Sequence, residues 1–170
     1  AGSIVGTYWF LMMIGRLCGA SIGAKVSSRA MLTVVSTVGI VLVLGAIFCA
    51  DNILVNMPVF KSDISFGFAQ VPVNVMLLIL CGLCTSVMWG GIFNLAVEGL
   101  GKYTAAASGL FMVMVCGGGI LPLIQGGVAD FAGFLNSYWV IALGLAYILF
   151  YAAIGSKNVN TDIPTDDYEA

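Results

Sequence analysis

Residues 30–50 read AMLTVVSTVGIVLVLGAIFCA, and no charged side chain interrupts this run. A bilayer hydrocarbon core of about 30 Å needs roughly 20 apolar residues to be crossed as a helix. In lipid every backbone N–H and C=O must be bonded internally, which a helix achieves within one segment. The stretch therefore predicts a membrane-spanning helix, and it sets the scale for reading the rest of the chain.

The remainder of the chain has the same character. Only 8% of its 170 residues are charged and 61% are hydrophobic, whereas soluble domains carry about 25% charged residues. Five segments reach the required length, and none shows the ten-residue alternation of a barrel strand. The predicted helices span about 4–24, 30–50, 71–97, 104–128 and 135–156. The predicted fold class is an all-α polytopic membrane protein with five transmembrane helices.

The basic residues of the short connections predict the orientation. Those on one side are Lys25, Arg29, Lys102 and Lys157, and the opposite side has Lys61. Because cytoplasmic loops carry the excess of Lys and Arg, the first group is placed in the cytoplasm. The N-terminus is then outside. We expect residues 158–170 to form a disordered acidic cytoplasmic tail.

The polar connection at residues 51–70 is expected to be an external loop. Its three phenylalanines are suited to the headgroup zone, and a re-entrant segment is the alternative. The chain starts almost inside an apolar segment, without Met or a basic leader. We therefore expect it to be a fragment that lacks a preceding part.

Several function classes are excluded by composition. There is no histidine, no carboxylate pair within the predicted helices and no basic patch. Neither an enzyme nor a nucleic-acid partner is expected. The sequence CGLC at 81–84 has redox or half-zinc spacing, but no second pair completes a site, so close packing is the preferred interpretation. No metal and no cofactor are predicted.

Glycines are placed where helices could approach or break. Gly15, Gly19 and Gly23 recur at four-residue spacing, which lets a neighbouring helix backbone come close. A second group consists of Gly117, Gly118, Gly119 and Pro122. It predicts a weakened helix, either at a transporter cavity or at a site of plain close packing.

Few polar side chains lie within the predicted helices. Thr85 and Trp89 are four residues apart, hence on one helix face, and an aromatic ring beside a hydroxyl suits a sugar. The sugar-contact candidates are Tyr8, Trp9, Thr85, Trp89 and Asn94. In the fourth helix the polar side chains are Ser108 and Gln125. Each of these could instead serve to bond one helix to another.

Charged residues near the cytoplasmic side form a candidate gating group. Glu98 could pair with the basic loop that contains Arg29, or remain a solvated interfacial acid. Arg16 lies within the first helix, where a charge is costly unless it faces a partner or a watered cavity. Its partner is either Glu98 or a residue outside this chain.

Three stretches carry a resemblance to a known family. They are YWFLMMIGRLCGASIGAKVSSRAML, LCGLCTSVMWGGIFNLAVEGLGKYTAAASGLFMVMVCGGGILPLIQGGVAD and SYWVIALGLAYILFYAAIGSKN. They closely resemble the C-terminal half of the fucose–galactose–glucose:proton symporter branch of the major facilitator superfamily. The resemblance implies twelve helices in two six-helix halves, with residues 1–157 supplying helices eight to twelve of a partial C-terminal half.

The same resemblance implies a function. It implies proton-coupled uptake of glucose, galactose or fucose by alternating access across a bacterial inner membrane, with protons as the coupling ion. The implied partners are a sugar, the lipid bilayer and the missing N-terminal half, which is expected to carry the acidic coupling residues. Two alternatives stay open: a major facilitator transporter for another solute, such as a drug or organic-acid exporter, and a non-transporting membrane sensor or scaffold.

Overall fold

A computed structural model describes residues 2–23, 25–49, 53–60 and 65–157. Its helices are α1 (Gly2–Gly23), α2 (Ser28–Phe48), α3 (Val73–Val97), α4 (Thr104–Met114), α5 (Gly117–Ala132) and α6 (Tyr138–Phe150). The 3₁₀ turn η1 (Gly101–Tyr103) precedes α4, and the π-helical turn η2 (Tyr151–Gly155) follows α6. Strands β1 (Leu54–Phe60) and β2 (Phe66–Pro72) form a hairpin. The expected acidic tail, Asp51 and Lys61 lie outside the described residues.

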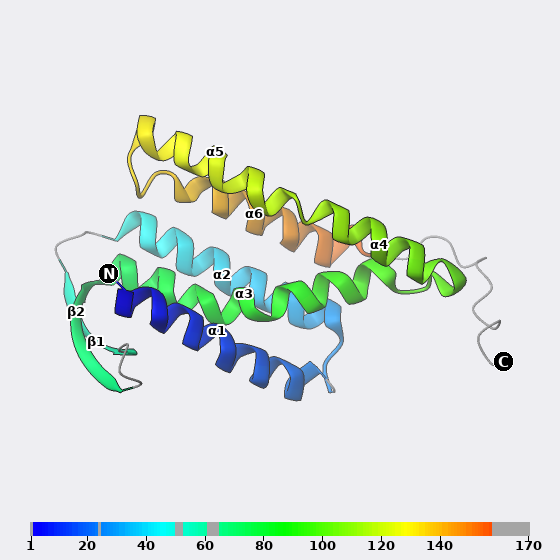
Figure 1. Cartoon of the computed structure of the whole chain (residues 1–170), viewed down its shortest axis with the longest axis horizontal. Coiled ribbons are helices and arrows are strands. Elements are labelled where there is room, and N and C mark those ends of the chain that lie inside the picture. The colour runs from blue at the N-terminus through cyan, green and yellow to red at the C-terminus, as the bar shows by residue number, and fades with distance from the viewer. Residues whose placement is uncertain (1, 24, 50–52, 61–64, 158–170) are drawn as a thin grey trace.

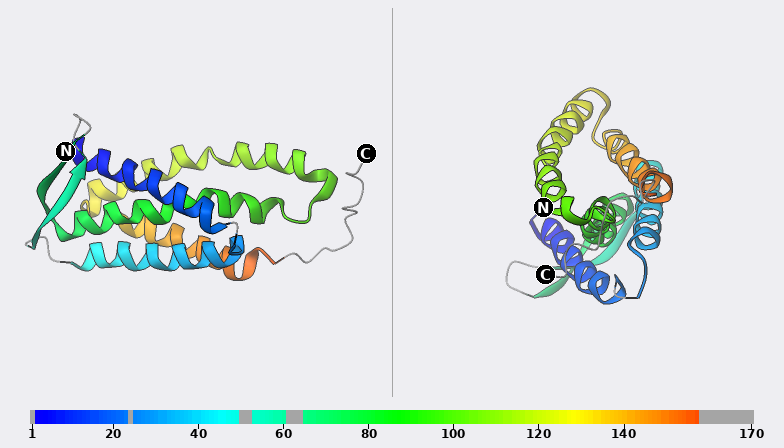
Figure 2. Two further views of the ribbon diagram at one scale, coloured as in Figure 1. Left: turned by 90° about the horizontal axis from the view of Figure 1, so that it is seen from below. Right: turned by 90° about the vertical axis from the view of Figure 1, so that its right-hand side faces the viewer.

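Five helical spans of the described chain are long and apolar enough to cross a membrane, counting 101–132 and 138–155 as one span each. The predicted all-α, multi-pass fold class is confirmed. α1 packs on α3, α3 on α2 and α2 on α6. α4 and α5 follow one another end to end along the bundle, and α5 packs on α6 (Figure 1). The hairpin lies across one end of the bundle (Figure 2).

The main packed core lies between α2, α3 and α6. Its most enclosed side chains include Leu32 and Val43 of α2, Met88 of α3 and Leu145 of α6. Inside a bilayer such contacts are driven by shape rather than by removal from water, since lipid is as apolar as leucine. This core holds three helices as one body.

Residues 54–60 and 66–72 form a β-hairpin, whereas the sequence predicts a loop over 51–70 and a helix starting at about residue 71. β2 continues through Pro72, and α3 begins at Val73. Buried Met57 and Val59 alternate with exposed neighbours, which is the period-two pattern of a half-covered strand. Described residues 53–60 and 65–70 therefore form no re-entrant helix.

The hairpin is fastened to the first helix. The Phe60 amide donates to Thr7 Oγ1 at 2.9 Å. The Phe60 ring stacks on Phe10 with centroids 5.2 Å apart and planes 3° apart. Because β2 leads directly into α3, the hairpin connects α1 to α3 at this end of the bundle.

The expected single helix over 104–128 is two helices in the structure. Between α4 and α5 the bonds are of the i to i−3 kind: Cys116 N to Val113 O at 3.2 Å, and Gly119 N to Cys116 O at 2.9 Å. α5 then runs to Ala132, four residues beyond the expected end. It stops at Gly133, whose φ of 94° is accessible mainly to glycine.

The last helix also begins later than expected, at Tyr138 instead of residue 135. Ser137 Oγ donates to the Phe134 carbonyl at 2.7 Å and holds the preceding turn. η2 completes the span at Gly155. The elements at the hairpin end are therefore the starts of α1, α3 and α6 and the ends of α2 and α5.

Candidate functional site

A hydroxyl pair joins α1 to α3. Tyr8 Oη lies 3.3 Å from Thr85 Oγ1, which also donates to the Gly82 carbonyl at 3.2 Å. Gly82 makes this approach possible, because a Cβ there would lie 3.0 Å from the Tyr8 ring. The two hydroxyls thus stand side by side at a place where α3 has no side chain to separate the helices.

A pocket of about 510 Å³ opens beside this pair. Its volume is in the range of small-ligand sites. Its apolar wall comes mainly from α1, α2, α3 and α6, and its polar side chains include Tyr8, Thr85, Gln125 and Tyr138. Because most of its lining lies in the half of the bundle nearer the hairpin, we call it the hairpin-side pocket.

The structure brings together only two of the five predicted sugar contacts. Trp9 is 61% exposed, and its ring makes an edge-to-face contact with the ring of Tyr8. Trp89 packs on Phe111 of α4, with ring centroids 5.1 Å apart. Asn94 Nδ2 lies 3.5 Å from Ser28 Oγ. Trp9, Trp89 and Asn94 do not line the hairpin-side pocket.

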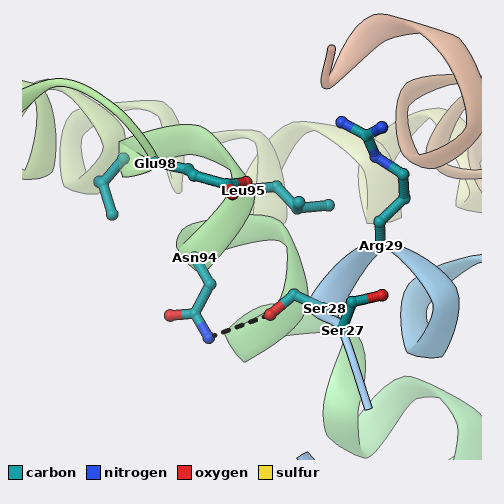
Figure 3. A pocket seen from close by; sticks show the side chains of 7 residues that line it. Ser27, Ser28, Arg29, Asn94, Leu95 and Glu98 are labelled. Atoms are coloured by element: carbon teal, nitrogen blue, oxygen red, sulfur yellow. Dashed lines mark hydrogen bonds between the residues drawn. The ribbon is translucent and has the colours of Figure 1, made fainter. Parts of the chain in front are cut away.

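A second pocket of about 620 Å³ lies at the opposite end, where α2 begins and α3 ends (Figure 3). Ser28, Arg29, Asn94 and Glu98 line it. Arg29 Nη2 donates to the Ser156 carbonyl at 2.9 Å. Among the described residues Glu98 and Arg29 form no ion pair; their carboxylate and guanidinium share a pocket while the guanidinium bonds to the end of the last helix.

Arg16 lines a third pocket of about 330 Å³ together with Ser86, Gly90 and Asn94. Its Nη2 lies 4.0 Å from Met12 Sδ. Glu98 does not line this pocket. Within the described part of the chain Arg16 therefore has no carboxylate partner, and Glu98, one of its two predicted alternatives, forms no ion pair with it.

The glycine stripe of α1 is a contact surface for two of its three members. Gly15 and Gly19 are buried against α3. A Cβ on Gly15 would overlap Ser86 Oγ, and one on Gly19 would overlap Val87 Cγ1. Gly23 is exposed, and a Cβ added there would meet Met31 Cε as its nearest atom, at 3.9 Å. In the second glycine group, a Cβ added at any of residues 117–119 would meet no atom of another element within 4 Å. Pro122 lies inside α5.

Two pocket residues were not among the predicted contacts. Gln125 is an amide in an otherwise apolar part of α5, and Tyr138 opens α6. Gln125 could have been chosen as a candidate from the sequence, because it is a polar side chain within a charge-free stretch. Tyr138 is indistinguishable in sequence from an interfacial aromatic, since no pattern shows that α5 and α6 meet α1 and α3 at one pocket.

The fold defines a multi-pass helical membrane protein, and its hairpin-side pocket is mainly apolar with a few polar side chains. No family model matches the chain, and no solved structure matches it at a significant level. Several curated proteins do match. A glucose/galactose transporter of Brucella abortus biovar 1 (strain 9-941) is 44% identical over 77 residues, covering 45% of this chain and 19% of that protein.

A putative glucose/galactose transporter of Helicobacter pylori (strain ATCC 700392 / 26695) is 32% identical over 155 residues, covering 88% of this chain and 33% of that protein. The L-fucose-proton symporter of Escherichia coli (strain K12) is 33% identical over 92 residues, covering 54% of this chain and 21% of that protein. The chain is similar to proteins of the fucose–galactose–glucose:proton symporter family of the major facilitator superfamily over as much as 88% of its residues. It spans between 19% and 33% of the length of these relatives.

Proposed function

We propose that the chain supplies helices eight to twelve of a transporter that takes up glucose, galactose or fucose together with a proton. The observation that carries the proposal is the Tyr8–Thr85 hydroxyl pair at the edge of the hairpin-side pocket. Hydroxyls that are both donors and acceptors suit a sugar, whose hydroxyls have the same two capacities. The names of the three relatives support the same substrate class.

The pockets suggest how a sugar would pass through this half. Thr85 lines the hairpin-side pocket, and its neighbour Ser86 lines the Arg16 pocket. Asn94 lines both the Arg16 pocket and the pocket at the opposite end. α3 therefore offers polar groups at successive depths, and rocking of this half against a partner half would expose them in turn.

The charged group is proposed to act at the far end. Arg29 and Glu98 line one pocket without pairing, and a conformational change that brings them together would close this end of the half. Arg16 is proposed to face an acidic residue of the N-terminal half. We further propose an inner-membrane location with the C-terminus in the cytoplasm, on the side of Lys25, Arg29, Lys102 and Lys157.

Uptake by the full-length protein in proteoliposomes tests this function. We expect labelled glucose, galactose or fucose to accumulate when the outside is made acidic, and unlabelled sugar to compete. A matched sample without an imposed pH difference is the control. Failure of all three sugars to enter, with a drug or organic acid moving instead, would reject the proposal in favour of another facilitator.

A further inference from the structure

We propose that Gln125 is a specificity-determining sugar contact, and that a sugar bridging it to the Tyr8–Thr85 pair tethers α5 to α1 and α3. The inference rests on the proposed function and deepens it. Gln125 lies on α5, which otherwise makes little contact with α1 and α3 across the pocket.

The polar side chains on the two sides of the hairpin-side pocket differ in which hydrogen-bonding groups they leave unpaired. Tyr8 and Thr85 already bond to each other. The Gln125 amide makes no hydrogen bond within the described residues, although it carries two donors and an acceptor. No buried side-chain nitrogen or oxygen in that part of the chain lacks a partner, so the amide is not sealed off. It is available to a ligand in the pocket that it lines.

The chemistry of a primary amide fits a hexose. Its carbonyl and NH₂ lie side by side, so it can accept from one ring hydroxyl while donating to the neighbouring hydroxyl. Phe134 and Tyr138 line the same pocket as an edge-to-face pair, with centroids 5.5 Å apart. An aromatic wall beside an amide offers both the apolar face and the hydrogen bonds that a sugar ring needs.

The position of Gln125 gives the contact a mechanical consequence. α5 packs mainly on α6 (Figure 1). A Cβ added at any of its glycines 117–119, 126 and 127 would meet no atom of another element within 4 Å. The i to i−3 turn at Cys116 separates α5 from α4. A ligand that bonds Gln125 and the Tyr8–Thr85 pair at once would link this loosely packed helix to the α1–α3 body.

The test is a cycle of sugar and protein variants in the full-length protein. Binding of the transported hexose and of its monodeoxy analogues is measured for wild type, Gln125→Leu and Gln70→Leu. Gln70 lies exposed on β2, away from the pocket, so it controls for the same chemical change. Gln125→Met, with a similar side-chain length, is measured as a second variant in case the leucine variant does not fold.

We expect Gln125→Leu to bind the parent sugar about tenfold more weakly, the size of one or two lost hydrogen bonds. In wild type, removal of at least one sugar hydroxyl should weaken binding by a similar factor. That loss of affinity should vanish in Gln125→Leu but persist in Gln70→Leu. Saturating sugar should also slow amide exchange across residues 117–132 in wild type and leave it unchanged in Gln125→Leu.

If every deoxy penalty persists in the Gln125 variants, the assignment is overturned while the transport function stands. Unchanged amide exchange in sugar-saturated wild type overturns the tether. If wild type binds no hexose at all, the proposed function fails and this inference fails with it.

Discussion

Replacing Gly15 with alanine is expected to destabilise the protein by about 1–3 kcal/mol, the usual cost of overpacking a closed interface. The new methyl group would overlap Ser86 Oγ and lie 3.0 Å from the Leu83 carbonyl oxygen. Ser86 itself donates to that carbonyl at 2.6 Å, so moving its side chain breaks a bond. Thermal unfolding of the purified full-length protein in detergent measures the loss.

Two further variants separate overpacking from a general effect of alanine. Gly23→Ala, in the same stripe, should be nearly neutral, because the nearest atom to the new methyl is Met31 Cε at 3.9 Å. Ser86→Gly should partly rescue Gly15→Ala by removing the atoms that collide. Equal unfolding temperatures for Gly15→Ala and Gly23→Ala would contradict the close α1–α3 contact.

Tyr8→Phe and Thr85→Val are each expected to weaken sugar binding about five- to tenfold, the equivalent of roughly 1 kcal/mol for a lost hydrogen bond. Each removes one hydroxyl from the pair while keeping the shape of the side chain. Because the two oxygens lie 3.3 Å apart, the double variant should lose less than the sum of the two free-energy changes. Equilibrium binding of the transported hexose checks this.

The control for these variants is Thr37→Val on α2. Thr37 is exposed and bonds back to the Thr33 carbonyl at 2.8 Å, and it lines neither the hairpin-side pocket nor the two pockets beyond it. It should bind sugar as wild type does. If Thr37→Val is as defective as Tyr8→Phe, the loss reflects helix stability and the hydroxyl pair has no special role.

The membrane-spanning architecture was predictable because length and lack of charge determine it segment by segment. The hairpin was not, since its alternation of buried Met57 and Val59 is short and is obscured by the polar residues around it. The break before Gly117 was expected from the glycines, but its position depends on the bonds of Cys116 and Gly119.

The candidate site was predictable only in part. Tyr8 and Thr85 have the right chemistry in sequence, but their contact depends on the absence of a side chain at Gly82. Charge alone suggests a pairing of Glu98 with Arg29 or Arg16 as one of two alternatives in each case, whereas the Arg29 guanidinium donates to a backbone carbonyl. Gln125 joins the pocket because α5 returns along the bundle, which is a matter of tertiary arrangement that no local pattern contains.

We propose that this chain is part of a transporter that moves a sugar together with a proton. The most direct measurement is the internal pH of proteoliposomes containing the full-length protein, recorded with an enclosed pH-sensitive dye. Adding glucose, galactose or fucose outside should make the interior more acidic, and L-glucose, the mirror image, should not. Entry of the sugar without acidification, or acidification driven only by a non-sugar solute, would contradict the account.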